Sequence, residues 1–265
     1  MEALLLPIFG FLIGIAAALS GIGGGIFIVP LLNLFYSQEV AVATGTSLAT
    51  IILISIASTA NYVKQKRVYF KVGLILALAT APGAYAGSEL IRIQLIKTWL
   101  GLIFGVFLII VAAQIVYNAV SSTSQTPCSQ TDNVFESTIL RKHEKLLVAF
   151  ALSFFGGVAS GLLGIGGGII LVPVMCYALD FPIHFSIPTS MFIMIFTSIS
   201  GVAGQLQQGN VDPQFAIYLG LGAIIGAQVG AYTSKKLSSR NLRLVFAVML
   251  IAASISMILK SFNII

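Results

Sequence analysis

The chain has 265 residues, of which 58% are hydrophobic and 8% are charged, and its formal net charge is +6 at pH 7. Soluble domains carry charge on about a quarter of their residues, so this composition excludes a soluble globular protein and indicates an integral membrane protein. The basic residues stand in short loops between apolar runs, which favours a role in membrane orientation over nucleic-acid binding.

The first half of the chain begins with an apolar run that glycines interrupt. Residues 3–19 are followed by Ser20-Gly21-Ile22-Gly23-Gly24-Gly25 and then by an 11-residue apolar run over 26–36, which carries Pro30. A helix of that length reaches only about 17 Å, roughly half of the hydrocarbon core. We therefore expect the chain to turn back near the membrane midplane. Three longer runs follow, and their lengths are typical of transmembrane helices rather than of barrel strands: 40–62, 69–88 and 96–118.

The second half of the chain repeats this plan without a gap. The glycine stretch returns as Leu163-Gly164-Ile165-Gly166-Gly167-Gly168, 143 positions after the first copy. Other pairs keep the same offset: Pro30 and Pro173, Thr46-Ser47 and Thr189-Ser190, Gly83 and Gly226. We therefore predict two membrane repeats, over 1–118 and 145–265, joined by a polar cytoplasmic linker over 119–144.

The charges of equivalent loops predict how the two repeats are oriented. Loop 64–71 is strongly basic, whereas its counterpart 207–214 carries only Asp212; loop 234–243 is strongly basic, whereas its counterpart in the first half is less so. Cytoplasmic loops collect Lys and Arg, so we expect 64–71, 119–145 and 234–243 on the cytoplasmic side of the cell (inner) membrane. Equivalent loops then lie on opposite sides.

That arrangement requires an odd number of crossings in each repeat. A single broken helix over 3–36 would give four crossings and would place the basic loop 234–243 outside. We therefore predict an all-α polytopic membrane protein of two inverted-topology repeats. Each repeat would consist of a glycine-broken re-entrant helical hairpin and three transmembrane helices, a plan used by many transporters.

The two glycine stretches are the predicted substrate-binding site. A helix that starts at Ile26 or Ile169 directs free N–H groups and its positive dipole end toward the preceding glycines. Glycine lacks the Cβ that would hide those groups from a small anion. We assign substrate binding to the glycines and to nearby hydroxyls that could add donors: Gly23, Gly24, Gly25, Thr46, Ser47, Gly166, Gly167, Gly168, Thr189 and Ser190.

Two alternative roles exist for these residue types. Glycine in membrane helices also serves close helix packing, and threonine and serine commonly bond back to their own helix. Hinge and packing roles are assigned to Pro30, Pro173, Gly83 and Gly226.

Other motifs do not support an enzyme, a cofactor or a metal site. The glycine stretches lack the Gly-Lys-Ser/Thr ending of a nucleotide-binding loop and have no strand before them. The two cysteines, Cys128 and Cys176, have neither metal-ligand spacing nor the pattern of a disulfide framework. Charged residues are absent from the middle of every predicted span, so no direct proton carrier is evident.

With these motifs in place, the chain resembles the TauE/SafE family of sulfite and organosulfonate exporters. The residues that carry the resemblance are Gly21 to Gly25 with Pro30, Gly45-Thr46-Ser47-Leu48, Pro82 to Gly87, their second-half copies, and Gln208 to Asp212. The first half departs from the pattern, with Lys66-Arg67-Val68-Tyr69 where the second half has Gly209-Asn210-Val211-Asp212.

The resemblance implies a prokaryotic-type carrier of a small sulfur-containing anion such as sulfite, thiosulfate or an organosulfonate. We therefore predict a secondary transporter that works by alternating access, with export as the expected direction. An anion channel with the same site and a non-transporting membrane scaffold or sensor are the alternatives. Small-residue faces over 73–88 and 220–231 would permit a homodimer.

Overall fold

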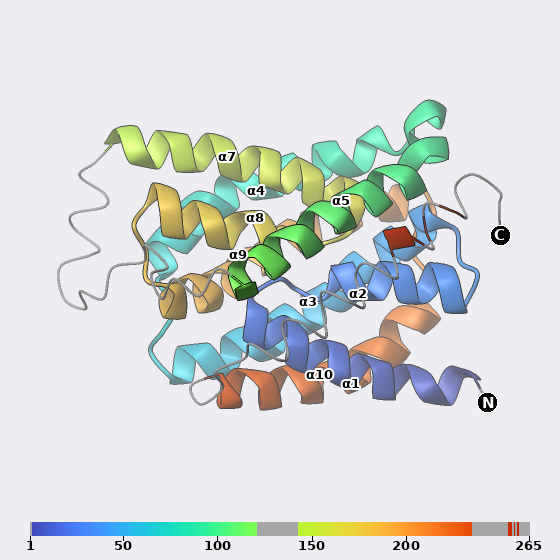
Figure 1. The fold of residues 1–265 in the computed structure, drawn as a ribbon, viewed down its shortest axis with the longest axis horizontal. Helices are drawn as coiled ribbons and strands as arrows, with labels where there is room; N and C mark the ends of the chain where they lie inside the picture. Colours follow the sequence, from blue (N-terminus) through green and yellow to red (C-terminus); the bar gives the residue numbers. More distant parts are fainter. Residues whose placement is uncertain (1, 121–142, 235–253, 256, 258, 260–265) are drawn as a thin grey trace.

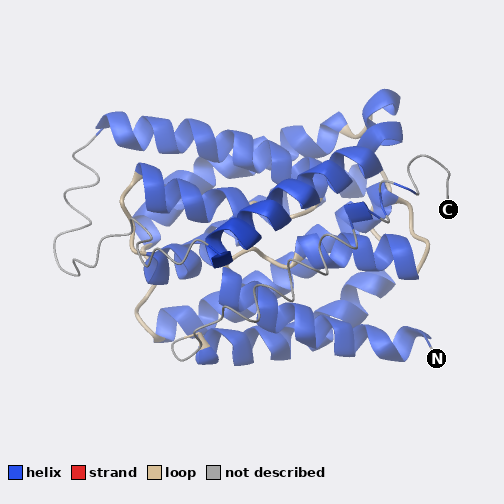
Figure 2. Cartoon of the chain, viewed as in Figure 1, coloured by secondary structure: helices blue, strands red, loops and turns tan. Residues whose placement is uncertain are grey.

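The computed structural model describes residues 2–120, 143–234, 254, 255, 257 and 259 (Figure 1). Throughout these residues the chain forms helices and loops and no strand (Figure 2), so the predicted all-α class is confirmed for this part of the chain. Most of the predicted linker and loop 234–243, and nearly all of the last predicted span, lie outside the described residues. The helices are α1 Glu2–Ser20, α2 Gly25–Pro30, η1 Leu31–Phe35, α3 Val40–Lys64, α4 Phe70–Leu90, α5 Gln94–Val120, α7 His143–Leu163, α8 Gly168–Pro173, η2 Val174–Ala178, α9 Ile183–Gln207 and α10 Pro213–Thr233.

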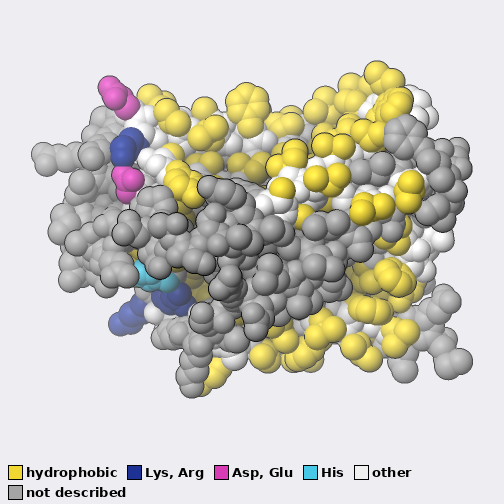
Figure 3. Space-filling view, in the orientation of Figure 1, with side chains coloured by type: hydrophobic (Ala, Val, Ile, Leu, Met, Phe, Trp, Pro, Cys, Tyr) yellow, Lys and Arg dark blue, Asp and Glu magenta, His cyan; other side chains and the backbone are white. Residues whose placement is uncertain are grey.

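Six of the described helices are long and apolar enough to cross a membrane: α3, α4, α5, α7, α9 and α10. Large apolar side chains such as Leu78, Ile110 and Leu221 are exposed on their outer faces. Figure 3 shows such side chains along the length of the molecule, with charged side chains gathered at its left end. An apolar exterior of this extent suits lipid and not water, so the protein is a multi-pass membrane protein.

The helix boundaries repeat with the offset seen in the sequence. From α2 to α4, each first-half helix begins and ends 143 positions before its counterpart among α8, η2, α9 and α10. The same backbone devices recur as well. Gly24 and Gly167 precede the short helices with φ of 87° and 84°, and a π-helix follows Pro30 and Pro173. Proline has no N–H to donate, which accounts for a change of hydrogen-bond register at this point in both copies.

Helix α1 packs against α10, and helix α7 packs against α4. We call α4 and α10 the fourth helices of their repeats, counting α2 with η1 and α8 with η2 as one helix each. The first helix of each repeat thus packs against the fourth helix of the other. Glycines make these contacts close. A Cβ on Gly226 would lie 2.0 Å from the carbonyl oxygen of Phe11, and one on Gly83 would lie 2.3 Å from that of Phe154. The small-residue faces of α4 and α10 are therefore occupied inside the chain. The predicted homodimer stays a prediction, and these faces do not offer its interface.

Helices α3 and α9 pack on each other at the centre of the molecule. Ile51 and Ile54 of α3 and Met191 and Met194 of α9 are completely buried. The glycine stretches after α1 and α7 meet against this central pair, so the core of the fold positions the predicted site.

Candidate functional site

The two glycine stretches form matching turns, which we call elbow one (Gly21–Gly25) and elbow two (Gly164–Gly168). In elbow one the φ angles of Gly21, Gly23 and Gly24 are 72°, 90° and 87°, and elbow two repeats them at 69°, 78° and 84°. Residues with a Cβ rarely adopt this left-handed conformation. Glycine is therefore required by the backbone at these positions.

The elbows touch each other. A Cβ on Gly25 would lie 2.2 Å from the carbonyl oxygen of Gly164, and a Cβ on Gly168 would lie 2.0 Å from that of Gly21. The first residue of α2 thus packs on Gly164, and the first residue of α8 packs on Gly21. The six predicted glycines, Gly23 to Gly25 and Gly166 to Gly168, are brought together and all are buried.

After the first glycine of each elbow, the N–H groups have no partners within the described part of the chain. Gly21 N–H closes α1 on the carbonyl of Ala17, and the next described bond runs from Phe27 N–H to the carbonyl of Gly24. No acceptor is described for the N–H groups of 22–26, or for those of 165–169 in elbow two. Buried N–H groups without partners are rare. Two rows of them at helix starts form a site suited to an anion.

The predicted serines hold the elbows in place. Ser47 Oγ donates to the carbonyl of Gly164 at 2.8 Å, and Ser190 Oγ lies 3.1 Å from the carbonyl oxygen of Gly21 and 2.8 Å from that of Ile187. Each serine therefore bonds to the elbow of the other repeat. This positions the turns, and it engages the hydroxyl hydrogen that a substrate would otherwise receive.

The predicted threonines contact a different part of the fold. Thr46 Oγ1 accepts from the N–H of Asp212 at 2.9 Å, and Thr189 Oγ1 accepts from the N–H of Tyr69 at 3.2 Å. Asp212 and Tyr69 stand immediately before α10 and α4. These hydroxyls therefore connect the repeats at the start of the fourth helices, and no bond to an elbow is described for them.

The comparisons with known proteins identify the family of the chain. The family model described as "Sulfite exporter TauE/SafE" matches residues 6–257. The chain belongs to the TauE/SafE family. The resemblance found in the sequence is thereby confirmed, and membership makes the protein a membrane transporter.

Relatives of the TauE/SafE chain align over nearly their full lengths. The "probable membrane transporter protein YunE" of Bacillus subtilis is 31% identical over 264 residues, which cover 95% of each chain. A probable membrane transporter protein of Methanocaldococcus jannaschii is 28% identical, with 96% of this chain and 95% of the relative covered. A relative from Haemophilus influenzae is 28% identical, with 97% and 98% covered. No solved structure matches the chain.

Two apolar residues of this TauE/SafE chain lie against the elbow glycines of the candidate site, and sequence reasoning missed both. Met194 Sδ lies 2.8 Å from the Cβ position of Gly23 and 3.2 Å from that of Gly166, and Ile51 Cγ2 lies 3.1 Å from the latter. Both side chains are fully buried. An apolar residue in the middle of a span resembles any core residue. Their places in the sequence were the one available signal. Ile51 and Met194 are equivalent residues, 143 positions apart, and each follows a predicted serine by one helical turn.

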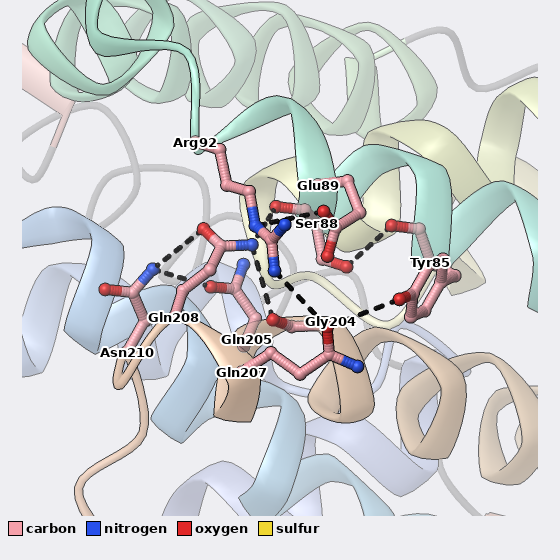
Figure 4. A network of polar contacts seen from close by, with 9 residues as sticks. All are labelled: Tyr85, Ser88, Glu89, Arg92, Gly204, Gln205, Gln207, Gln208 and Asn210. Carbon is pink, nitrogen blue, oxygen red and sulfur yellow. Dashed lines mark hydrogen bonds and ion pairs between the residues drawn. The ribbon is translucent and has the colours of Figure 1, made fainter.

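Polar clusters that the sequence did not reveal lie at the two ends of the bundle. At one end, Gln208 Nε2 donates to the carbonyl of Ser88 at 2.9 Å, and Arg92 Nη2 donates to Gln207 Oε1 at 3.3 Å (Figure 4). At the other end, Gln65 Nε2 donates to the carbonyl of Ala231 at 3.0 Å. Gln65 and Gln208 are equivalents. Each joins the end of a central helix to the end of the fourth helix of the other repeat.

Arg67 stands where the second repeat has Asn210. Its Nε donates to the carbonyl of His184 at 3.1 Å and its Nη1 donates to Ser234 Oγ at 3.2 Å. Partial burial lowers the pKa of the Arg67 guanidinium, but arginine starts so high that it stays protonated at neutral pH. A permanent positive charge therefore marks one end of the molecule.

No group of three or more His, Cys, Asp and Glu side chains that could hold a metal ion occurs among the described residues. Cys176 is a buried free thiol 3.4 Å from the Ser186 hydroxyl oxygen. The donors available at the elbows are backbone N–H groups, which suit an anion and not a cation.

Proposed function

We propose that this protein is a secondary transporter that moves a small sulfur-containing anion, such as sulfite, thiosulfate or an organosulfonate, by alternating access, with export as the direction. The observation that carries the proposal is the pair of buried N–H rows, without partners among the described residues, at the meeting point of the two elbows. A transporter that leaves such donors unpaired at its centre is equipped to receive oxygen acceptors there.

Neutral donors fit the task of a carrier. In a low-dielectric interior, helix dipoles and N–H groups attract an anion more strongly than they would in water. The proposed substrate-binding residues are the six glycines, with Ser47 and Ser190 positioning the elbows and Thr46 and Thr189 bracing the adjoining helices.

Inverted repeats are part of this proposal, and contacts at the helix ends support them. Lys145 at the start of α7 pairs with Asp180, just after η2, so the second hairpin enters and leaves at one end. The ring of Tyr36, just after η1, packs on Phe215 near the start of α10. Because Gly222 contacts Pro7 and Gly230 contacts Ile15, α10 runs parallel to α1. Tyr36 thus lies at the level where α1 begins.

The two hairpins begin at opposite ends of the bundle. Helix α7 runs parallel to α4, since Gly157 contacts Thr80 and Gly161 contacts Ala84. Helices α4 and α10 begin at opposite ends, because α4 begins just after Gln65 and Gln65 bonds to Ala231 near the end of α10 (Figure 1). Two hairpins entering from opposite sides, with their elbows in contact, give a central site that rocking of the repeats exposes alternately.

The charge distribution supports a cytoplasmic position for the end that carries loop 64–71. The charged side chains described at that end are mostly basic: Lys64, Lys66, Arg67, Lys71 and Lys145, against Glu144 and Asp180. At the opposite end, Arg92 and Lys97 stand with Glu39, Glu89 and Asp212, and both basic residues form ion pairs. Basic residues collect on the cytoplasmic side.

Uptake of radiolabelled sulfite into proteoliposomes tests the proposal. We expect saturable uptake that thiosulfate or sulfoacetate inhibits and that chloride does not, with counterflow when the vesicles are preloaded. An imposed pH gradient would reveal proton coupling. Flux without saturation or counterflow would indicate a channel. No flux, and no rise in melting temperature with any anion, would indicate a scaffold or sensor.

The double variant Gly24→Leu/Gly167→Leu tests the site itself. Both positions have positive φ, and the Cβ position of Gly24 lies 2.8 Å from Ile13 Cγ2. Bulky side chains there would cover the N–H rows and strain the backbone, so we expect transport to be lost and the melting temperature to fall, with uptake compared only for protein that still melts cooperatively in detergent. Normal flux through the folded double variant would refute the site.

A further inference from the structure

The two elbows share a backbone conformation but differ in the side chains beside their third left-handed glycine. In elbow one, the Cβ position of Gly24 lies 2.8 Å from Ile13 Cγ2, 3.3 Å from Ala17 Cβ and 3.5 Å from Ile54 Cδ1. All three neighbours are apolar, and the first is already closer than a real Cβ contact. This side of elbow one is therefore closed and offers no hydrogen-bond donor.

In elbow two, the equivalents of these three apolar neighbours are small or polar: Gly156, Ser160 and Thr197. The Cβ position of Gly167 has its nearest neighbours at 3.5 Å (Ser160 Cβ), 3.6 Å (Leu171 Cδ1) and 3.7 Å (the carbonyl oxygen of Gly156). These are ordinary van der Waals distances. Elbow two therefore has room for a Cβ beside the glycine that precedes the helix over 168–178, whereas elbow one has none.

The side chain of Ser160 borders that space, with its Cβ as the nearest atom. Its side chain is completely buried, and within the described residues its Oγ has no hydrogen-bond partner. Serine near the end of a helix usually bonds back to a carbonyl one turn earlier, as Ser20 does to Ala16 at 2.7 Å. A buried hydroxyl that forgoes this bond beside unpaired N–H groups points to a ligand that would complete it.

We infer that the anion binds unequally to the two elbows: the Ser160 hydroxyl and the N–H groups of Gly166 to Gly168 hold it on elbow two, while elbow one only closes the site. This assignment rests on the proposed anion transport and adds to it a binding residue and a preferred half. The chemistry selects a small oxyanion, because several oxygen atoms on one centre can accept from a hydroxyl and from neighbouring N–H groups at the same time.

The variants S160A and A17S form a matched pair for the test. S160A removes one oxygen atom and adds none, and A17S places a hydroxyl at the equivalent position of elbow one. Each purified full-length protein is reconstituted, and saturable sulfite uptake and the sulfite-dependent shift of melting temperature are measured. We expect S160A to raise the KM for sulfite about tenfold, with the maximal rate within about threefold, because a lost donor weakens binding. A17S should leave the KM within about twofold.

The outcomes separate this inference from the proposed function. Saturable uptake by the wild-type protein with an unchanged KM in S160A would overturn the role of Ser160 and leave the transport function standing. Equal losses in S160A and A17S would overturn the preference for elbow two. A wild-type protein with neither uptake nor anion-dependent stabilisation would overturn both proposals together.

Discussion

The two repeats make equivalent contacts with each other at the centre of the protein and different contacts at its ends. At the centre, the two elbows contact each other through backbone atoms, and these contacts are nearly identical in the two copies: Gly25 on Gly164 and Gly168 on Gly21. At the ends, the contacts come from side chains, and the copies have diverged. Gln65 and Gln208 make the same bond, but Arg67 stands opposite a neutral Asn210.

This difference indicates which features tolerate divergence. A crossing of two elbows at backbone distance accepts only glycine, so both copies must keep it. The ends face different aqueous compartments, and side chains there can differ without disturbing the crossing. The symmetric centre would form the part that moves, and the unequal ends would make the affinity for the anion differ between the two sides of the membrane.

The largest effect is expected from Gly168→Ala at the centre. The new Cβ would lie 2.0 Å from the carbonyl oxygen of Gly21, a backbone atom that a rotamer change cannot move away. We expect transport to be lost and the free energy of unfolding to fall by about 3 kcal/mol or more, measured by thermal unfolding in detergent and by uptake.

Gly25→Ala should have the same effects on transport and on the free energy of unfolding, because its Cβ would lie 2.2 Å from the carbonyl oxygen of Gly164. Gly73→Ala is the control, since a Cβ there meets the Phe192 ring, which can turn aside. Wild-type melting and uptake in Gly168→Ala would show that the elbows do not cross as described.

A smaller effect is expected from Arg67→Gln, which makes the ends more alike. The guanidinium bonds to the carbonyl of His184 and lies 5.8 Å from the centre of the Tyr62 ring. Its charge would raise the local concentration of an anion at that end. We expect initial uptake to fall about three- to tenfold at low ionic strength, and the difference from wild type to shrink at high salt.

Asn210→Gln is the matched change at the other end, where no charge is lost, and it should be insensitive to salt. An Arg67→Gln defect of equal size at every ionic strength would mean that Arg67 acts through its hydrogen bonds and not through its charge.

The sequence predicted much of the fold because the signals were local and present twice. The glycine stretches, Pro30 with Pro173 and the lengths of the apolar runs each depend on a few neighbouring residues. The partners of Ser47 and Thr46 could not be predicted, because they lie in the other repeat, 117 and 166 positions away. The small faces of α4 and α10 revealed close packing but not its partner, since glycine fits a helix of the same chain as well as one of a second chain.

The smallest effect concerns Gln65→Leu and Gln208→Leu, each of which removes one bond between the repeats. Gln65→Leu removes the donor to the carbonyl of Ala231, and Gln208→Leu removes the donor to the carbonyl of Ser88. A lost hydrogen bond of this kind contributes about 1 kcal/mol, enough to shift a two-state equilibrium about fivefold. In alternating access, weakening one end favours the state open at that end.

Gln65→Leu should therefore lower the KM measured from the side of loop 64–71 and raise it from the opposite side, and Gln208→Leu should do the reverse. Uptake into right-side-out and inside-out vesicles measures both values. Two variants that shift the KM on the same side would argue against opposed gates, because equivalent bonds in inverted repeats must act on opposite sides. Opposite shifts would tie the duplication directly to the transport cycle.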